Sequence, residues 1–388
     1  MVGHIDCDAM FAAIECLLNP RLAGQPVIVG ADPQGGQGRG VVATCSYPAR
    51  VFGVRSAMPI SEAYRRCPQG VFLPVRHEVY RAYGDRVMAL LRETTRTLQR
   101  VSIDECYVDW TAHGPAAVAV AEGIRARVRQ EIGLTISVGI AATRLVAKIA
   151  SDLRKPDALV VCAPGEEAAL LGPLPVGRIP GVGPRTQDLL RAAEITTIGD
   201  IQRADLTLLR AAVGARRAEE ALRAARGQDD SPVVGEPAVP LSFSQEHTWA
   251  RDEAERREVW QVVQRMADTL ARRLEARGWA ARQVGVKLRT AAYETTTRDH
   301  ALRSPVLDAA AIAGEAALLI ARHWDRRPLR LIGVRVAHFV PSDAPYQLPL
   351  PLPAGAHRNA APGHAAESGS TACYNGPGGV SQVSRAGR

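Results

Sequence analysis

The chain contains 388 residues, of which 46% are hydrophobic, and its 48 Lys and Arg exceed its 40 Asp and Glu to give a net charge of +8. This length and apolar content support two to four packed domains and exclude a mainly disordered chain. No apolar run approaches the roughly 20 residues that span a bilayer, and the first residues lack an export signal. We therefore expect a cytoplasmic protein that does not enter membranes.

The cysteines and basic residues narrow the class of protein further. The seven cysteines show no CxxC pair or other zinc-like spacing, which indicates reduced thiols in the cytosol. The excess positive charge favours a polyanionic partner. Only three basic residues are lysine: Lys148, Lys155 and Lys287. Lys148 and Lys155 lie close together in the sequence, where their ammonium groups could meet a phosphate, although chance is a competing explanation.

Apolar periodicity predicts alternating strands and helices through the first 165 residues. In chain order, these are a strand at 1–8, a helix at 11–18, a strand at 26–29, a loop at 32–38, a helix at 80–98, a hairpin at 101–109, a helix at 116–131, a strand at 134–140, a further helix and a strand at 158–161. The order strand, helix, hairpin, helix, strand is that of a split βαβ sheet, with residues 11–75 as a subdomain inserted in the first crossover.

Two acidic clusters lie in these strand-like segments. Asp6 and Asp8 belong to the first strand, and Asp104 and Glu105 belong to the hairpin. Carboxylates avoid sheet cores unless they are paired or bind a metal, so neighbouring strands that carry them predict a divalent-cation site for phosphoryl transfer. Asp104 and Glu105 can converge only near the hairpin turn, and strand alternation would direct Asp6 and Asp8 toward Asp104. Hairpin capping and surface salt bridges are the alternatives.

Residues 166–230 are predicted to form short, alanine-rich helices with two glycine turns, at 179–183 and 213–215. Such turns expose backbone N–H groups at a helix N-terminus, which suits a DNA phosphate of any sequence. One turn of this kind would favour an ordinary helix connection. Two of them favour DNA binding.

The C-terminal third begins with a polar, proline-bearing stretch at 229–240 that is typical of a tether. Residues 242–340 hold 17 Arg and Lys against 12 Asp and Glu, and they predict a basic α/β module with strands at 283–290 and 330–339 and two helices. Beyond residue 340 the sequence is rich in Pro, Gly and Ala without periodicity, so we expect a disordered tail.

Four motifs occur in order: HIDCDAMFAAIE at 4–15, VATCSYPARVFGVRSAMP at 42–59, SIDECYVD at 102–109 and IPGVG at 179–183. Together they resemble the Y-family translesion DNA polymerases of the polymerase IV (DinB) branch. The resemblance implies an α/β (α+β) right-hand polymerase with a ferredoxin-like palm, small fingers, a helix-hairpin-helix thumb and an α/β little finger. The implied domains are a palm at 1–10 and 76–165, fingers at 11–75, a thumb at 166–232, a linker at 233–241, a little finger at 242–340 and a disordered tail at 341–388.

The resemblance also implies a reaction, the addition of deoxynucleoside triphosphates to primer–template DNA past damaged bases, with two Mg²⁺ ions in the active site. Asp6 and Asp104 would bind metal, and Glu105 would complete the catalytic site beside the primer 3′ hydroxyl. One ion would acidify that hydroxyl while the other neutralises the triphosphate. Asp8 would support these carboxylates or bind metal itself.

Further residues are assigned to the nucleotide by the same resemblance. Phe11 would lie under the incoming sugar and exclude a 2′ hydroxyl, unless it is a plain core phenylalanine. The residues that would contact the triphosphate are Thr44, Tyr47, Arg50 and Lys155. Arginine can offer two parallel hydrogen bonds to phosphate oxygens, whereas a packing role is the alternative for Tyr47.

The resemblance extends to DNA and to a sliding clamp. Gly181, Gly183 and Gly214 would face the DNA backbone. Residues 347–352 resemble the peptide by which bacterial polymerases bind the clamp, although a proline-rich linker could produce such a sequence by chance. The clamp-binding side chains would be Gln347, Leu348, Leu350 and Leu352.

An active, error-prone polymerase that works as a monomer is the leading hypothesis, since no segment of the chain is left for a proofreading nuclease. A catalytically inactive adaptor that binds DNA and the clamp is the alternative. Such an adaptor would be expected to lose its carboxylates, whereas this chain retains Asp6, Asp104 and Glu105. A purely structural DNA-binding protein would leave the first 165 residues unexplained.

Overall fold

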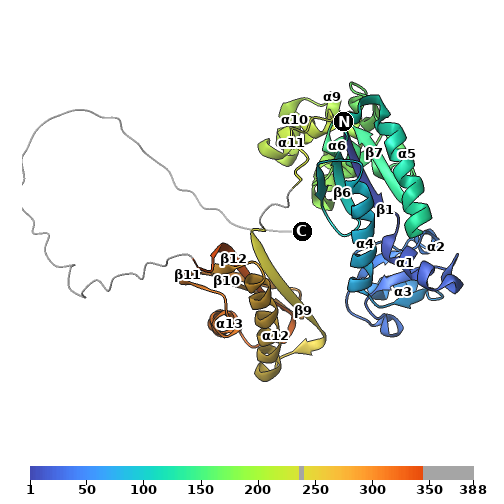
Figure 1. Cartoon of the computed structure of the whole chain (residues 1–388). Helices are drawn as coiled ribbons and strands as arrows, with labels where there is room; N and C mark the ends of the chain where they lie inside the picture. Colours follow the sequence, from blue (N-terminus) through green and yellow to red (C-terminus); the bar gives the residue numbers. More distant parts are fainter. Residues whose placement is uncertain (236–239, 344–388) are drawn as a thin grey trace, which may run out of the picture. The chain divides into compact units, whose positions relative to one another are not determined.

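A computed structural model describes residues 1–235 and 240–343 (Figure 1). The first body is a five-stranded sheet of order β5-β6-β1-β7-β8, in which all neighbours are antiparallel except β7 and β8. Its strands are β1 (Val2–Cys7), β5 (Leu98–Arg100), β6 (Glu105–Asp109), β7 (Ile136–Ala141) and β8 (Leu159–Val161). The predicted split βαβ arrangement is confirmed, with β1 at the centre of the sheet.

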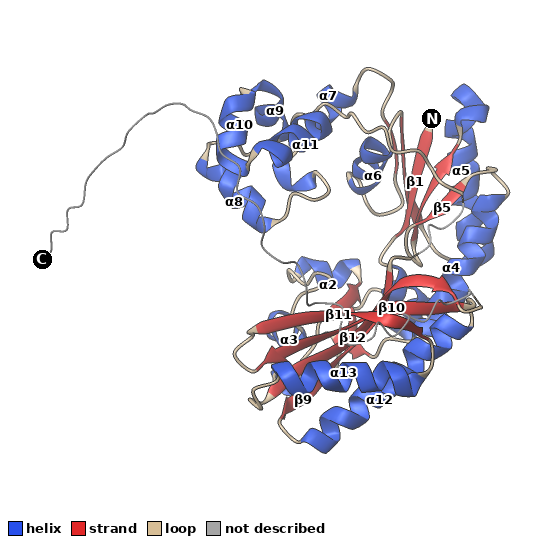
Figure 2. Cartoon of the chain, turned by 90° about the vertical axis from the view of Figure 1, so that its left-hand side faces the viewer, coloured by secondary structure: helices blue, strands red, loops and turns tan. Residues whose placement is uncertain are grey.

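Helices cover both faces of this sheet (Figure 2). α4 (His77–Arg92) and α5 (Ala117–Arg127) share an apolar core with the central strands, whereas α6 (Arg144–Asp152) packs on the opposite face against β1 and β7. Gly139 of β7 permits this approach, because a Cβ at that position would lie only 2.0 Å from the Ala147 carbonyl oxygen. α6 is therefore held close to the middle of the sheet.

A small three-stranded sheet of order β3-β2-β4 forms the second body. Its own core is built around Ile28, Val42, Val54 and Ile60. The elements are α1 (Met10–Leu18), β2 (Val27–Gly30), β3 (Val42–Cys45), α2 (Tyr47–Val51), α3 (Ile60–Arg66) and β4 (Val71–Leu73). α1 begins three residues after β1 ends and packs into the core of the larger sheet, so its first turn lies at the end of the central strand.

Five short helices follow β8 and share an apolar core with α6. Thr197 and Asp200 form a reciprocal capping box at the start of α9, and Asp205 caps α10, so these helices begin where their own side chains satisfy the first N–H groups. Their bounds are α7 (Glu167–Leu171), α8 (Pro184–Ala192), α9 (Ile198–Arg203), α10 (Leu206–Val213) and α11 (Ala215–Ala225).

The last body is a four-stranded antiparallel sheet of order β11-β10-β12-β9, with two helices packed on one of its faces (Figure 2). We call it the C-terminal module. Its elements are β9 (Ser242–Glu253), α12 (Arg256–Glu275), β10 (Trp279–Thr290), β11 (Thr295–Val306), α13 (Ala309–His323) and β12 (Leu329–Pro341). Alternate residues of β10 and β12 enter the core beneath the helices, and the remaining positions form an open face.

Several sequence expectations differ from this structure. The predicted helix at 80–98 is wrong beyond Arg92, because Leu98 begins β5 and its apolar side chain belongs to the sheet. The strands β9 and β11 were not predicted. Most of their residues are polar and partly or fully exposed, so neither segment carries the apolar alternation that marks a half-buried strand.

None of the helices in these two described stretches is long and apolar enough to cross a membrane. The six cysteines at 7, 16, 45, 67, 106 and 162 are free thiols. Two predicted segments lie outside the described residues: the clamp peptide at 347–352 and all but the first three residues of the disordered tail. Cys373 lies outside them as well.

Candidate active site

The pairing of β1 with β6 brings the two acidic clusters together. Asp6 lies directly opposite Glu105, and directly opposed residues of an antiparallel pair point to the same face of the sheet. The Cys7 N–H donates to the carbonyl of Asp104 at 3.0 Å, which fixes the turn before β6. The Ser102 hydroxyl in that turn donates to the Asp104 carboxylate. The predicted placement of Asp104 and Glu105 at the hairpin turn is confirmed.

Asp6 is balanced by a lysine that follows α6. Lys155 Nζ lies 2.6 Å from Asp6 and 2.7 Å from Asp152. Burial raises the pKa of Asp6 to about 6, an effect that Lys155 opposes and that the nearby charge of Asp104 increases. Burial acts against the charged form of Lys155, but Asp6 and Asp152 outweigh it and raise the Lys155 pKa. Lys155 is therefore the cation that balances Asp6 and Asp152 at this strand end.

Glu105 is held by two residues that bind the same oxygen. His4 Nε2 lies 2.7 Å from Oε1, and Lys148 of α6 donates to Oε1 as well. Burial works to raise the pKa of Glu105, but the hydrogen bonds from His4 and Lys148 outweigh it and lower that pKa to about 2. Oε2 has no hydrogen-bond donor within the part of the chain that the structure describes. Glu105 is therefore ionised, with one oxygen anchored.

His4 is itself fixed from its other side. The ring is fully buried, and its Nδ1 lies 2.7 Å from the hydroxyl oxygen of Ser151 on α6. The Ser151 hydroxyl is also 2.8 Å from the carbonyl of Lys148. Burial lowers the pKa of His4. Sheet, helix and acidic residue are thus joined in one hydrogen-bonded chain.

Asp8 occupies a different position from the other acids. β1 ends at Cys7, so the strand alternation from which Asp8 was expected to point toward Asp104 does not extend to Asp8. Asp8 is buried, and it accepts hydrogen bonds from the Ser137 hydroxyl at 2.7 Å and from the Asp157 N–H at 2.7 Å. The Tyr47 hydroxyl lies 3.5 Å away. Asp8 therefore anchors the segment that carries Lys155.

Phe11 lies on the first turn of α1. Its ring stacks on Tyr80 with centroids 4.2 Å apart and an interplanar angle of 16°, and Phe11 keeps part of its surface exposed. The Tyr80 hydroxyl donates to Glu15 at 2.6 Å, and Arg76 binds the same carboxylate. The Phe11 ring is thus backed by a rigid aromatic partner.

The other predicted nucleotide contacts lie on β3 and α2. Thr44 is on β3, and Tyr47 and Arg50 lie on α2, with the guanidinium carbon of Arg50 4.5 Å from the Tyr47 ring centroid. Burial, reinforced by Asp8, raises the pKa of Tyr47 to about 12, so the phenol remains a neutral donor. Arg50 has no carboxylate partner among residues 1–235 and 240–343. A cationic group is therefore left available near Asp8.

The two predicted glycine turns have the geometry that requires glycine. Gly181 and Gly214 have φ values of 89° and 86°, which L side chains rarely adopt, and Gly183 and Gly214 directly precede α8 and α11. A Cβ built at any of these three glycines meets nothing within 4 Å. The space beside both helix N-termini is open, as a phosphate would need.

Sequence reasoning missed His4, Ser151 and Asp152 and did not connect Lys148 to Glu105. A signal was present in the spacing. His4 and Asp6 are two residues apart and share one strand face, and the polar residues of the α6 segment recur at helical spacing on the face toward the sheet. Polar residues facing a sheet core indicate a buried network.

The donor set fits a divalent cation. Carboxylate oxygens are the ligands that Mg²⁺ prefers. Several carboxylates at the centre of a sheet are stable only when positive charge balances them. Across the described residues, no three His, Cys, Asp or Glu side chains already stand together as a metal cage. Lys155 and Lys148 supply the balancing positive charge instead.

Three segments match known families. Residues 5–152 match the impB/mucB/samB family, residues 240–350 match its C-terminal domain, and residues 177–229 match the thumb domain of DNA polymerase iota. The chain is 45% identical over 339 residues to a DNA polymerase IV of Methanoculleus marisnigri, covering 87% of this chain and 94% of the relative. It is 42% identical to a DNA polymerase IV of Streptomyces coelicolor, covering 86% and 70%.

Solved structures agree with these relatives. A chimeric Y-family DNA polymerase, Dbh-Dpo4(243-245)-Dbh, superposes with a TM-score of 0.77 at 25% identity, covering 87% of this chain and 99% of the chimera. DinB from Sulfolobus solfataricus superposes with a TM-score of 0.61, also at 25% identity, covering 87% and 98%. On the sequence identities and coverage together, the chain belongs to the DNA polymerase IV (DinB) branch of the Y-family and is a DNA-directed DNA polymerase of translesion synthesis.

Proposed function

We propose that this polymerase adds deoxynucleotides to a primer 3′ end, opposite damaged or undamaged template, by two-metal phosphoryl transfer without proofreading. The observation that carries the proposal is the direct opposition of Asp6 and Glu105 on adjacent strands, next to Asp104, with each cluster balanced by a lysine. An inactive adaptor would have no use for such a costly arrangement of buried charge.

Asp6, Asp104 and Glu105 are the residues that would hold two Mg²⁺ ions. The bound metal supplies a Lewis acid that acidifies the primer hydroxyl and neutralises the leaving pyrophosphate. His4 and Lys148 orient Glu105 through Oε1, so that Oε2 is the oxygen available for binding. Asp8 acts indirectly, by fixing the Asp157 backbone two residues after Lys155.

Lys155, Arg50, Tyr47 and Thr44 would bind the incoming triphosphate. Lys155 pairs with Asp6, so its ammonium group is charged and held in place before the nucleotide arrives. A phosphate of the incoming nucleotide would then replace Asp6 as the partner of Lys155. Phe11 would exclude ribonucleotides, because its ring, held by Tyr80, offers no hydrogen-bond partner to a 2′ hydroxyl.

The remaining bodies would serve as the domains of a right-hand polymerase. In this proposal the palm comprises 1–10 and 76–165, the fingers 11–75, the thumb 166–232 and the little finger 242–340. Gly181, Gly183 and Gly214 would bind the DNA backbone through helix N-termini, as their open surroundings support. Residues 347–352 would bind a sliding clamp, and the polymerase would act as a monomer.

Primer extension tests this proposal. With Mg²⁺, the wild-type protein is expected to extend a primed template, and Asp104→Ala is expected to abolish extension while gel-shift affinity for the DNA persists. Asp109→Ala is a matched control, because Asp109 ends the strand that follows Asp104 and is exposed. Equal extension by wild type and Asp104→Ala would refute the metal assignment.

A further inference from the structure

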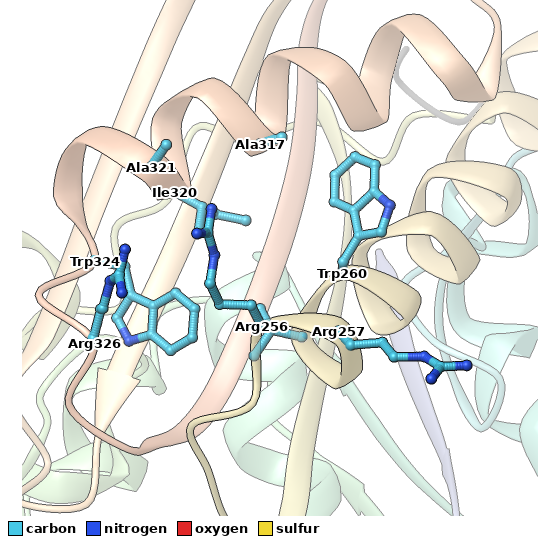
Figure 3. Close-up of a pocket in the computed structure, with 9 residues that line it drawn as sticks. Arg256, Arg257, Trp260, Ala317, Ile320, Ala321, Trp324 and Arg326 are labelled. Carbon is cyan, nitrogen blue, oxygen red and sulfur yellow. The ribbon is translucent and has the colours of Figure 1, made fainter.

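The C-terminal module carries an apolar groove that the polymerase reaction does not use. It lies between α12 and α13 and has a volume of about 460 Å³ (Figure 3). A second hollow of about 640 Å³ continues along the same two helices, and Trp260 lines both. The first hollow is lined by Arg256, Arg257, Val259, Trp260, Ala317, Ile320, Ala321, Trp324 and Arg326.

The groove arises from a mismatch in side-chain size. α13 presents small residues to it, at Ala310, Gly314, Ala317 and Ala321, whereas α12 presents the indole of Trp260. Trp260 is 37% exposed. A large aromatic side chain beside an open apolar hollow marks a surface suited to an apolar partner.

The charged residues that line the first hollow are all basic, whereas the second hollow is lined by Arg265 and Asp268. Arg256, Arg257 and Arg326 line the first hollow together with no acidic side chain. None of the three has an ion pair in the described stretches 1–235 and 240–343, whereas the neighbouring Arg327 pairs with both Asp325 and Glu294. Figure 3 shows Arg256 extending from α12 toward Ile320, between the two indoles. All three arginines are exposed, so each guanidinium group is accessible to a carboxylate of a partner.

We propose that this groove binds a short acidic segment of another protein, with a bulky apolar side chain against Trp260 and carboxylates on Arg256 and Arg326. A groove that runs along two helices, with an exposed indole and nearby guanidinium groups, suits an extended peptide with one apolar anchor. The chain's own C-terminus is a poor complement, because residues 344–388 contain one acid, Glu367, against three arginines. The aliphatic floor, at Val259 and Ile320, suits a side chain better than a stacked base.

The probe is a short fluorescein-labelled peptide in which Asp and Glu flank two Phe residues, titrated with the full chain and followed by fluorescence anisotropy. Arg256→Glu and Trp260→Ala are each expected to weaken binding about tenfold. Arg322→Glu makes the same charge change on α13 outside both hollows, and it should alter binding less than about twofold. Primer extension should be unchanged in all three variants, which shows that they fold.

Four outcomes would overturn the proposal. Equal weakening by Arg322→Glu and Arg256→Glu would mean that the attraction is unspecific. If oligo-dT displaces the peptide, and Trp260→Ala also abolishes oligo-dT binding, the groove binds single-stranded DNA instead. A dimer in sedimentation that dissociates in Trp260→Ala would identify a second copy of the chain as the occupant. A peptide with Ser in place of both Phe residues should bind more weakly than the Phe peptide. Equal affinity of the two peptides would show that no apolar side chain is bound in the groove.

Discussion

The three lysines of the chain form ion pairs in two settings that differ mainly in how far the carboxylate is buried. Beside β1 and β6, Lys155 pairs with Asp6 and Lys148 with Glu105, and the four side chains are 16 to 31% exposed. On the open face of the C-terminal module, Lys287 pairs with Glu246 at 31 and 43% exposure. Partial burial makes the loss of one partner costly, whereas exposed pairs contribute little. We therefore expect single substitutions beside β1 and β6 to have large effects, and single substitutions on the open face to have small ones.

The largest expected effect comes from the residues that anchor Glu105. His4→Ala and Lys148→Met are each expected to raise the Mg²⁺ concentration needed for half-maximal primer extension by about tenfold or more, because each leaves Oε1 with one partner. Lys287→Met is the control and should leave the Mg²⁺ requirement unchanged. If all three variants respond alike, the contrast between the two regions fails.

Removing Lys155 is expected to destabilise the protein in a pH-dependent way. In metal-free buffer, Lys155→Ala should lower the free energy of unfolding by about 2 kcal/mol at pH 8, because Asp6 is then ionised without its partner. The Asp6 pKa is already raised to about 6, and losing Lys155 raises it further. A carboxyl whose pKa is raised on folding is stabilising when protonated and loses that contribution as the pH rises through the folded pKa.

The cost of Lys155→Ala should therefore shrink at pH 5, where Asp6 is mostly protonated in both proteins. Denaturant unfolding at the two pH values measures this difference. Lys287→Ala serves as the exposed counterpart and should cost less than about 0.5 kcal/mol at either pH. A loss for Lys155→Ala that is equally large at pH 5 and pH 8 would show that Asp6 is not the group responsible.

A moderate effect is expected from Phe11. Phe11→Ala should increase ribonucleotide incorporation relative to deoxynucleotide incorporation by about tenfold or more, because the variant gives room to a 2′ hydroxyl. Single-nucleotide addition with matched ribo- and deoxynucleoside triphosphates provides the measurement. Tyr80→Phe keeps the stacked ring and should preserve discrimination. Unchanged discrimination in Phe11→Ala would place the sugar contact elsewhere.

The smallest effect is expected on the open face of the C-terminal module, which we expect to meet DNA phosphates through basic residues such as Arg289 of β10. Arg289→Ala should weaken binding to primed DNA only about two- to threefold and reduce the dependence of log affinity on log salt by about 1, as expected for one phosphate contact. Anisotropy at several salt concentrations measures both quantities. A loss above about tenfold would show that this face also concentrates its function in single residues.

The sequence predicted the central sheet and its acids because both depend on local patterns. Apolar alternation marked β1, β6 and β7, and acids inside those strands marked the site. β9 and β11 were missed because their polar residues carry no such pattern. The pairing of His4 and Lys148 with Glu105 depends on how α6 packs across the sheet, which is a long-range contact that strand and helix periodicities do not encode.

Direct measurement of divalent-ion binding tests the central claim, that the acids at β1 and the β6 turn hold the catalytic metal. Mn²⁺ binding is followed by electron paramagnetic resonance, with dideoxy-terminated primed DNA and the matching nucleotide present. The wild type and Asp109→Asn should bind Mn²⁺ alike, and Asp6→Asn combined with Glu105→Gln should lose that binding while keeping DNA affinity. Undiminished Mn²⁺ binding by the double variant would contradict the account.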